Sequence, residues 1–442
     1  MTPRQSPTDL AQHIQETTLI DTHEHLNKEN DWLFNGPGDV LADLFSNYVQ
    51  FDLISAGASP RAITQLTDAS AADIETRWRA VEKAWSATRL TGYGRAVRTL
   101  AKHVYDIDEI TPGTVAAAQP RLEALRQGGQ RLHLLRDRAR IDQVQTDDKC
   151  WACVPDLSGL DFFLYDISWV GFCARGIAFE QLTQETQVTV KDLATLKQAM
   201  EVLFEKYGPC AIAVKSQHAY NRTLRWSPPD DAEAERQLQT ILTASDTSDV
   251  PVPLVLGDWS LARGVELAIE HNLPFKIHTG SYAGNYRMPV ERIRPGHLCP
   301  LLARYPDARF VLMHIGYPYQ DELIALAKHY PNVYVDLCWA WSLDPYASSD
   351  FVRQFLHAAP ANKLFGFGGD THWPTSTYAY SIQMRHNLTK ALEAEVATCE
   401  LTETEAIDVA TRLMRDNQRA CFDIEGTRSA IRDAAGSMAP GI

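Results

Sequence analysis

The fold is decided by two stretches in the second half of the chain, LARGVELAIEHNLPFKIHTG (261–280) and HLCPLLARYPDARFVLMHIG (297–316). Each has a helical pattern of apolar residues, followed by a short and mostly apolar run that ends in a histidine. A short apolar run after a helix is typical of a buried parallel strand. Because the helix–strand unit repeats, the sequence predicts a parallel sheet with right-handed crossovers.

The same unit recurs along most of the chain, and helical stretches such as Leu261–His271 and Gln320–His329 separate most of the predicted strands. Eight such units favour an α/β fold, a closed (β/α)8 TIM-like barrel with its active site at the C-terminal strand ends. A doubly wound open sheet is the alternative, but no glycine-rich fingerprint follows the first strand. The predicted strands are Thr18–Thr22, Ile141–Gln145, Phe162–Val170, Ala211–Lys215, Phe275–His278, Phe310–His314, Val333–Cys338 and Leu364–Gly368.

The pattern between the first two strands is different. It consists of amphipathic helical segments, such as Ala71–Leu90 and Pro120–Arg138, with few β-branched runs. We therefore predict a barrel made of residues 1–26 and 141–442, with a helical insertion subdomain, residues 27–140, after strand 1.

Composition argues against several classes of partner. The chain has 442 residues, with 42 Lys and Arg against 56 Asp and Glu, and a net charge of −14 disfavours nucleic acid and anionic membranes. No run of about 18 apolar residues and no secretory signal is visible, so we expect a cytoplasmic protein with a small-molecule substrate. The eight cysteines, including the lone pair Cys150 and Cys153, are expected to be reduced.

Residues that can bind a metal stand at the ends of several predicted strands. The first strand is followed by THEH (22–25), and because side chains alternate along a strand, His23 and His25 face one side. Glu24 faces the other side, where a structural role is expected. The fourth strand ends in Lys215, which is either a lysine that snorkels to the rim or one carboxylated by CO₂.

The fifth and sixth strands end in His278 and His314, and Asp370 follows the eighth. A buried histidine without a partner is costly, so two at equivalent places on consecutive strands indicate a common role. A lone aspartate after a strand is ordinarily a helix N-cap, but here it joins other ligands at the same end of the barrel. The joint pattern predicts a divalent metal centre, with Zn²⁺ as the expected ion, held by residues from this set: His23, His25, Lys215, His278, His314 and Asp370.

This order of ligands resembles the signature of the amidohydrolase superfamily of metal-dependent barrel hydrolases. The closer resemblance is to its amidohydrolase-related (amidohydrolase 2) branch, found alone in bacteria and fused to glutamine-synthetase-like domains in fungi and plants as nodulin-like proteins. No such domain follows here, so the stand-alone form is expected, and Thr371 stands where that branch often has alanine. The matching segments are DTHEHL (21–26), VKSQHAYNRTL (214–224), ELAIEHNLPFKIHTG (266–280), HLCPLLARYPDARFVLMHIGYPY (297–319), YPNVYVDLCWAW (330–341), KLFGFGGDTHWP (363–374) and LMRDNQRACF (413–422).

The resemblance implies a hydrolase that uses metal-activated water on an amide, ester or lactone bond of a small, carboxylate-bearing substrate. Asp370 would move the proton from the nucleophile to the leaving group. With two ions, a carboxylated Lys215 would bridge to a second ion held by His278 and His314. With one ion, Lys215 would balance substrate charge and His314 would polarise the substrate carbonyl. Self-association into a homo-oligomer is also implied.

Five residues just past strand ends are predicted substrate contacts: Tyr220, Arg222, Tyr317, His372 and Trp373. Arg222 suits a carboxylate because its planar donors match two oxygens, although a surface arginine paired with an acid is the alternative. The aromatic residues have the alternative of packing against the insertion.

Two non-hydrolytic chemistries share this scaffold and stay open as alternatives. In uronate-isomerase-like enzymes an arginine-bearing segment follows the strand-eight aspartate, whereas here the run is Asp370-Thr371-His372. Decarboxylase-like enzymes usually have an acidic residue in place of one strand-one histidine and are shorter. A barrel used only for binding would carry no stoichiometric metal.

Overall fold

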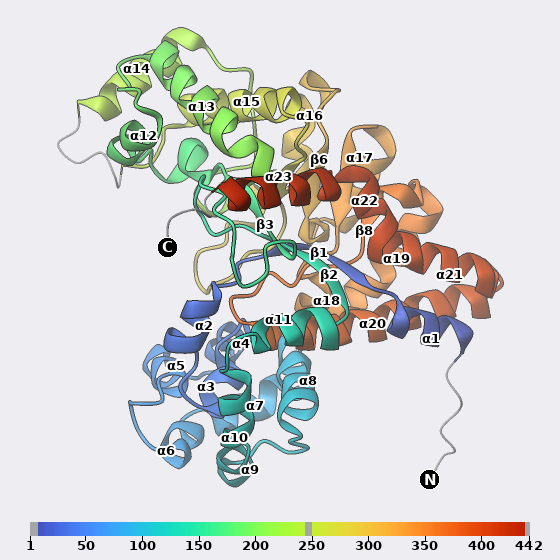
Figure 1. The fold of residues 1–442 in the computed structure, drawn as a ribbon. Helices are drawn as coiled ribbons and strands as arrows, with labels where there is room; N and C mark the ends of the chain where they lie inside the picture. Colours follow the sequence, from blue (N-terminus) through green and yellow to red (C-terminus); the bar gives the residue numbers. More distant parts are fainter. Residues whose placement is uncertain (1–7, 244–249, 438–442) are drawn as a thin grey trace.

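The computed structural model describes residues 8–243 and 250–437. Within these ranges eight parallel strands form one sheet in chain order, each strand paired with the next, and helices surround them (Figure 1). The predicted (β/α)8 barrel is therefore confirmed. The strands are β1 (Leu19–Glu24), β2 (Ile141–Thr146), β3 (Phe163–Ser168), β4 (Ala211–Ser216), β5 (Phe275–His278), β6 (Phe310–Met313), β7 (Val333–Asp336) and β8 (Leu364–Phe365).

Backbone hydrogen bonds beyond β8 bring the sheet back to β1. Thr22 N donates to Phe367 O at 3.0 Å, and Asp370 N donates to His23 O at 3.0 Å. The barrel is thus nearly closed, and the segment that closes it carries Asp370. This closure places the end of β1 beside the residues that follow β8.

Four strands, β3, β6, β7 and β8, end earlier than predicted. β8 stops at Phe365 because Gly366 N donates to Leu413 O at 2.7 Å, outside the sheet. The backbone turns into the left-handed region at His314 after β6, with φ +65°, and at Trp339 beyond β7, with φ +62°. A residue in that region cannot continue an extended ladder, so His314 stands on a turn rather than in a strand.

Helices cover the outside of the barrel. The predicted helix Leu261–His271 overlaps the longer α15, which ends one residue earlier at Glu270, and the predicted helix Gln320–His329 matches α17 end to end. The helices are α1 (Asp9–Glu16), α12 (Phe179–Thr186), α13 (Leu193–Tyr207), α14 (Asp231–Leu242), α15 (Leu254–Glu270), α16 (Cys299–Arg304), α17 (Gln320–His329), α18 (Ala340–Leu343), α19 (Pro345–Ala358), α20 (Pro374–Ala397), α21 (Glu403–Thr411), α22 (Asn417–Cys421) and α23 (Ile424–Ser437).

The segment between β1 and β2 forms short helices that gather at one end of the barrel (Figure 1). The two long helices predicted there are divided. Ala71–Leu90 is broken around Ala80 and Val81, and Pro120–Arg138 is broken at Gly129, which takes φ +81°. The helices are α2 (Glu29–Asn35), α3 (Val40–Phe45), α4 (Val49–Ser55), α5 (Pro60–Thr67), α6 (Ile74–Arg79), α7 (Glu82–Thr88), α8 (Gly92–Tyr105), α9 (Pro112–Ala117), α10 (Gln119–Leu125), α11 (Gln130–Leu132) and the π-helix η1 (His133–Arg138).

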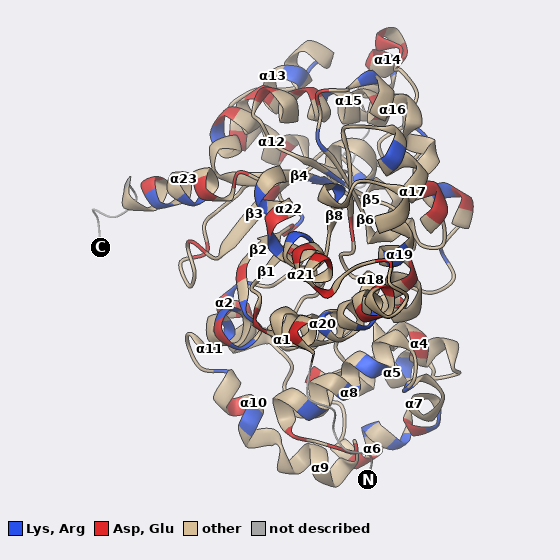
Figure 2. Ribbon diagram, turned by 90° about the vertical axis from the view of Figure 1, so that its right-hand side faces the viewer, with Lys and Arg blue, Asp and Glu red and all other residues tan. Residues whose placement is uncertain are grey.

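Charge is spread over the outer surface. Acidic and basic residues are interspersed along the outer helices in Figure 2, and strand side chains are almost all buried. Among the described residues, no helix combines the length and apolar character needed to cross a membrane. All eight cysteines lie in the described ranges and are free thiols, Cys150 and Cys153 among them.

Candidate metal centre

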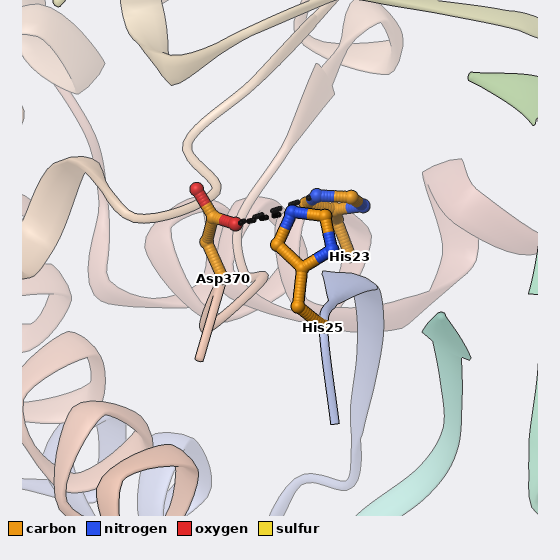
Figure 3. Close-up of side chains that lie close together, drawn as sticks. All are labelled: His23, His25 and Asp370. Atoms are coloured by element: carbon orange, nitrogen blue, oxygen red, sulfur yellow. Dashed lines mark ion pairs between the residues drawn. The ribbon is translucent and has the colours of Figure 1, made fainter. Parts of the chain in front are cut away.

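Three of the predicted ligands converge at the closure of the barrel. The Nε2 atoms of His23 and His25 each lie 3.4 Å from Oδ1 of Asp370 (Figure 3). His23 and Asp370 are almost fully buried, and His25 is slightly exposed. The two histidines come from the end of β1 and face one side of it, as the alternation along the strand predicts.

This spacing fits a divalent ion. Four ligands arranged tetrahedrally around zinc at about 2.1 Å lie about 3.4 Å from one another. The two histidine-to-carboxylate distances have that value. Three protein ligands leave the fourth position of the tetrahedron for water or substrate, which is the arrangement of catalytic zinc sites.

The tautomer of His25 also fits a ligand. Its Nδ1 donates to the backbone carbonyl of Asp147 at 2.5 Å, which leaves Nε2 with a lone pair that faces Asp370. Ligating histidines almost always bind a carbonyl or carboxylate through the other ring nitrogen in this way. Burial and the nearby His23 lower the pKa of His25 well below 6.5, so the neutral form that binds metals is favoured.

Asp370 is held rigidly by its backbone. Its φ is +56°, its N–H donates to His23, and Tyr48 Oη donates to its carbonyl at 2.5 Å. Glu24 Oε2 accepts from Thr371 N at 2.5 Å, so this carboxylate lies under the same turn. Burial alone raises the pKa of the Asp370 carboxyl, but the neighbouring histidines outweigh it and hold that pKa well below 3.8. The ionised carboxylate that a metal requires is therefore favoured.

A buried ion pair lies behind His23. Lys276 Nζ donates to both oxygens of Asp166 at 2.9 Å and to the carbonyl of Thr22 at 2.7 Å, and neither charged side chain is exposed. Asp166 Oδ2 is 3.9 Å from His23 Nδ1, which has no hydrogen-bond partner among the described residues. Asp166 can thus orient the imidazole from behind, as second-layer carboxylates do at metal sites.

The other three predicted ligands lie close by in different arrangements. Lys215 Nζ is 3.3 Å from His23 Nε2 and 3.0 Å from Met313 Sδ, and burial lowers its pKa. His278 Nε2 donates to the carbonyl of Ser281 at 3.0 Å. Burial lowers the pKa of His314 to about 3, and its Nε2 is 3.9 Å from Asp370 Oδ2. Neither His278 nor His314 belongs to the group formed by His23, His25 and Asp370.

A cavity of about 400 Å³ opens onto this group, and His25 and Asp370 line it. Two predicted substrate contacts line it as well. Tyr220 Oη accepts from Ala283 N at 3.2 Å, and the ring of His372 stacks on His25 with centroids 5.6 Å apart.

The other three predicted substrate contacts lie outside the cavity lining. Arg222 pairs with the buried Asp258 and also donates to backbone carbonyls, so its guanidinium fastens the chain after β4 to α15. The backbone carbonyl of Tyr317 accepts from Ser281 N at 2.7 Å. Trp373 packs its ring 5.9 Å from that of Trp32 in the insertion. Each is therefore placed in the packing around the site rather than at the cavity.

Sequence reasoning missed most of the cavity lining, including one tyrosine of the insertion and three cations: Tyr48, Lys149, Arg175 and Arg287. Lys149 and Arg287 come from the loops after β2 and β5, and Arg175 ends the π-helix η2 (Gly171–Arg175) after β3. None of the three forms an ion pair within the described part of the chain. Each lies several residues beyond its strand, where the path of a loop cannot be read from the sequence. Tyr48 lies in the insertion, where no local pattern marks it.

The second half of the chain, which includes Asp370 but not His23 or His25, matches a known family. A family described as Amidohydrolase matches residues 190–417, more than half of the chain. The chain belongs to the amidohydrolase family. Protein fluG of Emericella nidulans is 27% identical over 226 residues, which are 49% of this chain and 26% of fluG. The chain thus spans about a quarter of the length of that relative.

Solved structures with 15 to 18% identity share the fold of this chain. Glucuronate isomerase from Caulobacter crescentus (18% identity) has a TM-score of 0.76, covering 96% of this chain and 97% of its own. Uronate isomerase from Thermotoga maritima (15%) has a TM-score of 0.74, covering 93% and 96%. A protein from Lactobacillus casei assigned as a metal-dependent hydrolase (16%) has a TM-score of 0.67, covering 96% and 99%.

Proposed function

We propose that the protein is a metal-dependent hydrolase that cleaves an amide, ester or lactone bond of a small substrate carrying a carboxylate. The observation that carries this proposal is the group of His23, His25 and Asp370, with its 3.4 Å spacings, at the edge of a 400 Å³ cavity. These three residues would hold a divalent ion, with Zn²⁺ as the expected ion, which would activate water at neutral pH and polarise a carbonyl.

Asp370 is the proposed proton carrier. It lines the cavity, it is ionised, and only one of its oxygens faces the strand-one histidines. The carboxylate can take a proton from the attacking water and return it to the leaving group, work usually worth about 10²–10⁴ in rate. Tyr48 and Glu24 hold the turn on which it stands and so fix its direction.

The carboxylate of the substrate is assigned to the three cations at the cavity. Lys149, Arg175 and Arg287 are exposed at its mouth, come from three separate segments and lack acidic partners within residues 8–243 and 250–437. In a chain of net charge −14, three unpaired cations around one cavity attract an anionic ligand by both steering and charge-assisted hydrogen bonds.

A second candidate, isomerisation of a sugar acid, has one observation in its favour. The insertion lines the cavity with the hydrogen-bonding groups of Ser46, Asn47, Tyr48 and Gln50, which suit several substrate hydroxyls. The likeness to uronate isomerases concerns the fold alone. The two candidates differ in product: hydrolysis adds one water, whereas isomerisation leaves the mass unchanged.

Product mass therefore provides the test. Zinc-loaded protein is incubated with acyl-amino-acid, lactone and sugar-acid libraries, and products are weighed by mass spectrometry. We expect the products together to exceed the substrate in mass by one water. We expect the rate of Asp370→Asn to be about 10²–10⁴-fold lower, with zinc still bound. Products of unchanged mass would favour the isomerase, and a fully active Asp370→Asn would refute the proton carrier.

The anion site is tested separately by Arg175→Met. Loss of one charge-assisted hydrogen bond should raise KM for a carboxylate substrate about tenfold with kcat little changed. Arg225→Met is the matched control, because Arg225 is exposed nearby but does not line the cavity. An unchanged KM in Arg175→Met would remove this arginine from the substrate site.

A further inference from the structure

A second group of ligand atoms lies beside the first. One atom each from His314, Cys338 and Asp370 lies within 4.8 Å of the others, and all three residues are buried. Cys338 follows β7 and His314 follows β6, so the group spans three neighbouring strand ends. The two groups share Asp370 and no other residue.

The carboxylate of Asp370 faces both groups. Its Oδ1 is 3.4 Å from the Nε2 atoms of His23 and His25, while its Oδ2 is 3.9 Å from Nε2 of His314. A carboxylate turned in this way can bridge two ions, which lie about 3.5–4 Å apart in two-metal sites. The two oxygens of Asp370 can therefore serve one ion each, and in that two-ion state Oδ2 is a ligand, whereas its proton-carrier role belongs to the one-ion state.

The ring of His314 is already oriented as a ligand. Its Nδ1 donates to the carbonyl of Cys338 at 3.0 Å, and its Nε2 has no hydrogen-bond partner among the described residues. A buried imidazole nitrogen without a partner is unfavourable unless something binds it. Ligating histidines use one nitrogen for such a carbonyl bond and the other for the metal.

Cys338 has room only because a glycine faces it. A Cβ added at Gly368 would lie 2.8 Å from Cys338 Sγ. The backbone N of Cys338 donates to Asp336 Oδ1 at 2.8 Å, which fixes the start of the turn after β7. The thiol is thus held among the other ligand atoms, and thiolate sulfur is a soft ligand that favours zinc over magnesium or manganese.

We propose that a second divalent ion binds between His314, Cys338 and Asp370, with Asp370 bridging the two ions. The inference rests on the metal centre of the proposed function, but not on the reaction. It differs from the arrangement implied by the family resemblance, in which a carboxylated Lys215 and His278 hold the second ion. His278 belongs to neither group of ligand atoms, and Lys215 Nζ contacts His23 and Met313.

Cobalt substitution tests the proposal without an activity assay. The metal-free protein is titrated with Co²⁺, and bound metal and near-ultraviolet absorption are measured together, because a cobalt–thiolate bond gives a charge-transfer band there. We expect two equivalents and a band in the wild type. Cys338→Ser should lose the band and one equivalent and keep the other. Cys421→Ser, which alters a buried thiol at the end of α22 and outside both groups, should keep both equivalents and the band.

Each other outcome refutes a stated part of the inference or of the proposed function. One equivalent without a band in the wild type refutes the second ion and leaves the proposed function standing. A wild type that binds two equivalents without a band would assign the second ion to the lysine arrangement, provided that Lys215→Met loses one equivalent and Cys338→Ser keeps both. No stoichiometric cobalt in the wild type refutes both the inference and the metal centre. Circular dichroism of each variant shows that lost metal does not reflect lost fold.

Discussion

Asp43 allows a prediction about how the insertion docks on the barrel. This carboxyl on α3 is 1% exposed, and it accepts hydrogen bonds from Tyr105 Oη at 2.6 Å and Thr375 Oγ1 at 2.9 Å. Tyr105 is on α8 of the insertion and Thr375 on α20 of the barrel. Burial raises the pKa of Asp43 from 3.8 to about 6 despite these hydrogen bonds.

A raised carboxyl pKa sets the sign of the pH dependence. Between the unfolded and folded pKa values the native state keeps a proton that the unfolded state has released, so stability falls as pH rises. Each pKa unit is worth about 1.36 kcal/mol, so raising the pH from 4.5 to above 6 costs about 2 kcal/mol through Asp43 alone. The amide introduced by Asp43→Asn cannot titrate, so the variant avoids that loss.

The test is urea unfolding of the wild type and Asp43→Asn at pH 4.5 and 7.5. Relative to the wild type, the variant should gain about 2 kcal/mol between the two pH values. Any pH-independent effect of the amide cancels in this comparison. Asp307→Asn, at an exposed carboxyl, should show no such change. A gain below about 0.5 kcal/mol would refute the idea that Asp43 is buried in this interface.

Three further predictions concern the centre itself. Gly369→Ala places a Cβ 2.0 Å from Glu24 Oε1 and should displace the turn of Asp370, weakening zinc about 10–100-fold in chelator competition; unchanged affinity would contradict this. Lys276→Met leaves Asp166 buried without its cation and should lower the unfolding free energy by about 3–5 kcal/mol in urea, so a loss under about 1 kcal/mol would count against it. Zinc at about 100 times its Kd should stabilise the metal-free protein by about 2.7 kcal/mol, and an unchanged melting temperature would argue against the centre.

Strand-end reasoning predicted the convergence of His23, His25 and Asp370 because two local rules suffice for it. Side chains alternate along a strand, and the C-terminal ends of parallel strands meet at one face of a barrel. Cys338 also closes a predicted strand, but only the structure shows its thiol beside His314.

The substrate side of the site was decided by tertiary structure. The guanidinium of Arg222 suits a carboxylate, but in the fold it forms an ion pair with Asp258. Arg175 and Arg287 line the cavity instead, from segments that follow β3 and β5. A loop places its side chains by contacts with distant segments, as when Asn285 Nδ2 donates to Phe51 O of α4 at 3.2 Å.

The sequence by itself determined the barrel and the end of it that carries chemistry, because strand periodicity and helix spacing are local properties of the chain. The three-dimensional arrangement decided which of the predicted ligands lie together, which cations face the cavity and how the insertion meets Asp370. Those outcomes depend on distances of a few ångströms between residues hundreds of positions apart, as between Tyr48 and Asp370, and no local pattern encodes them.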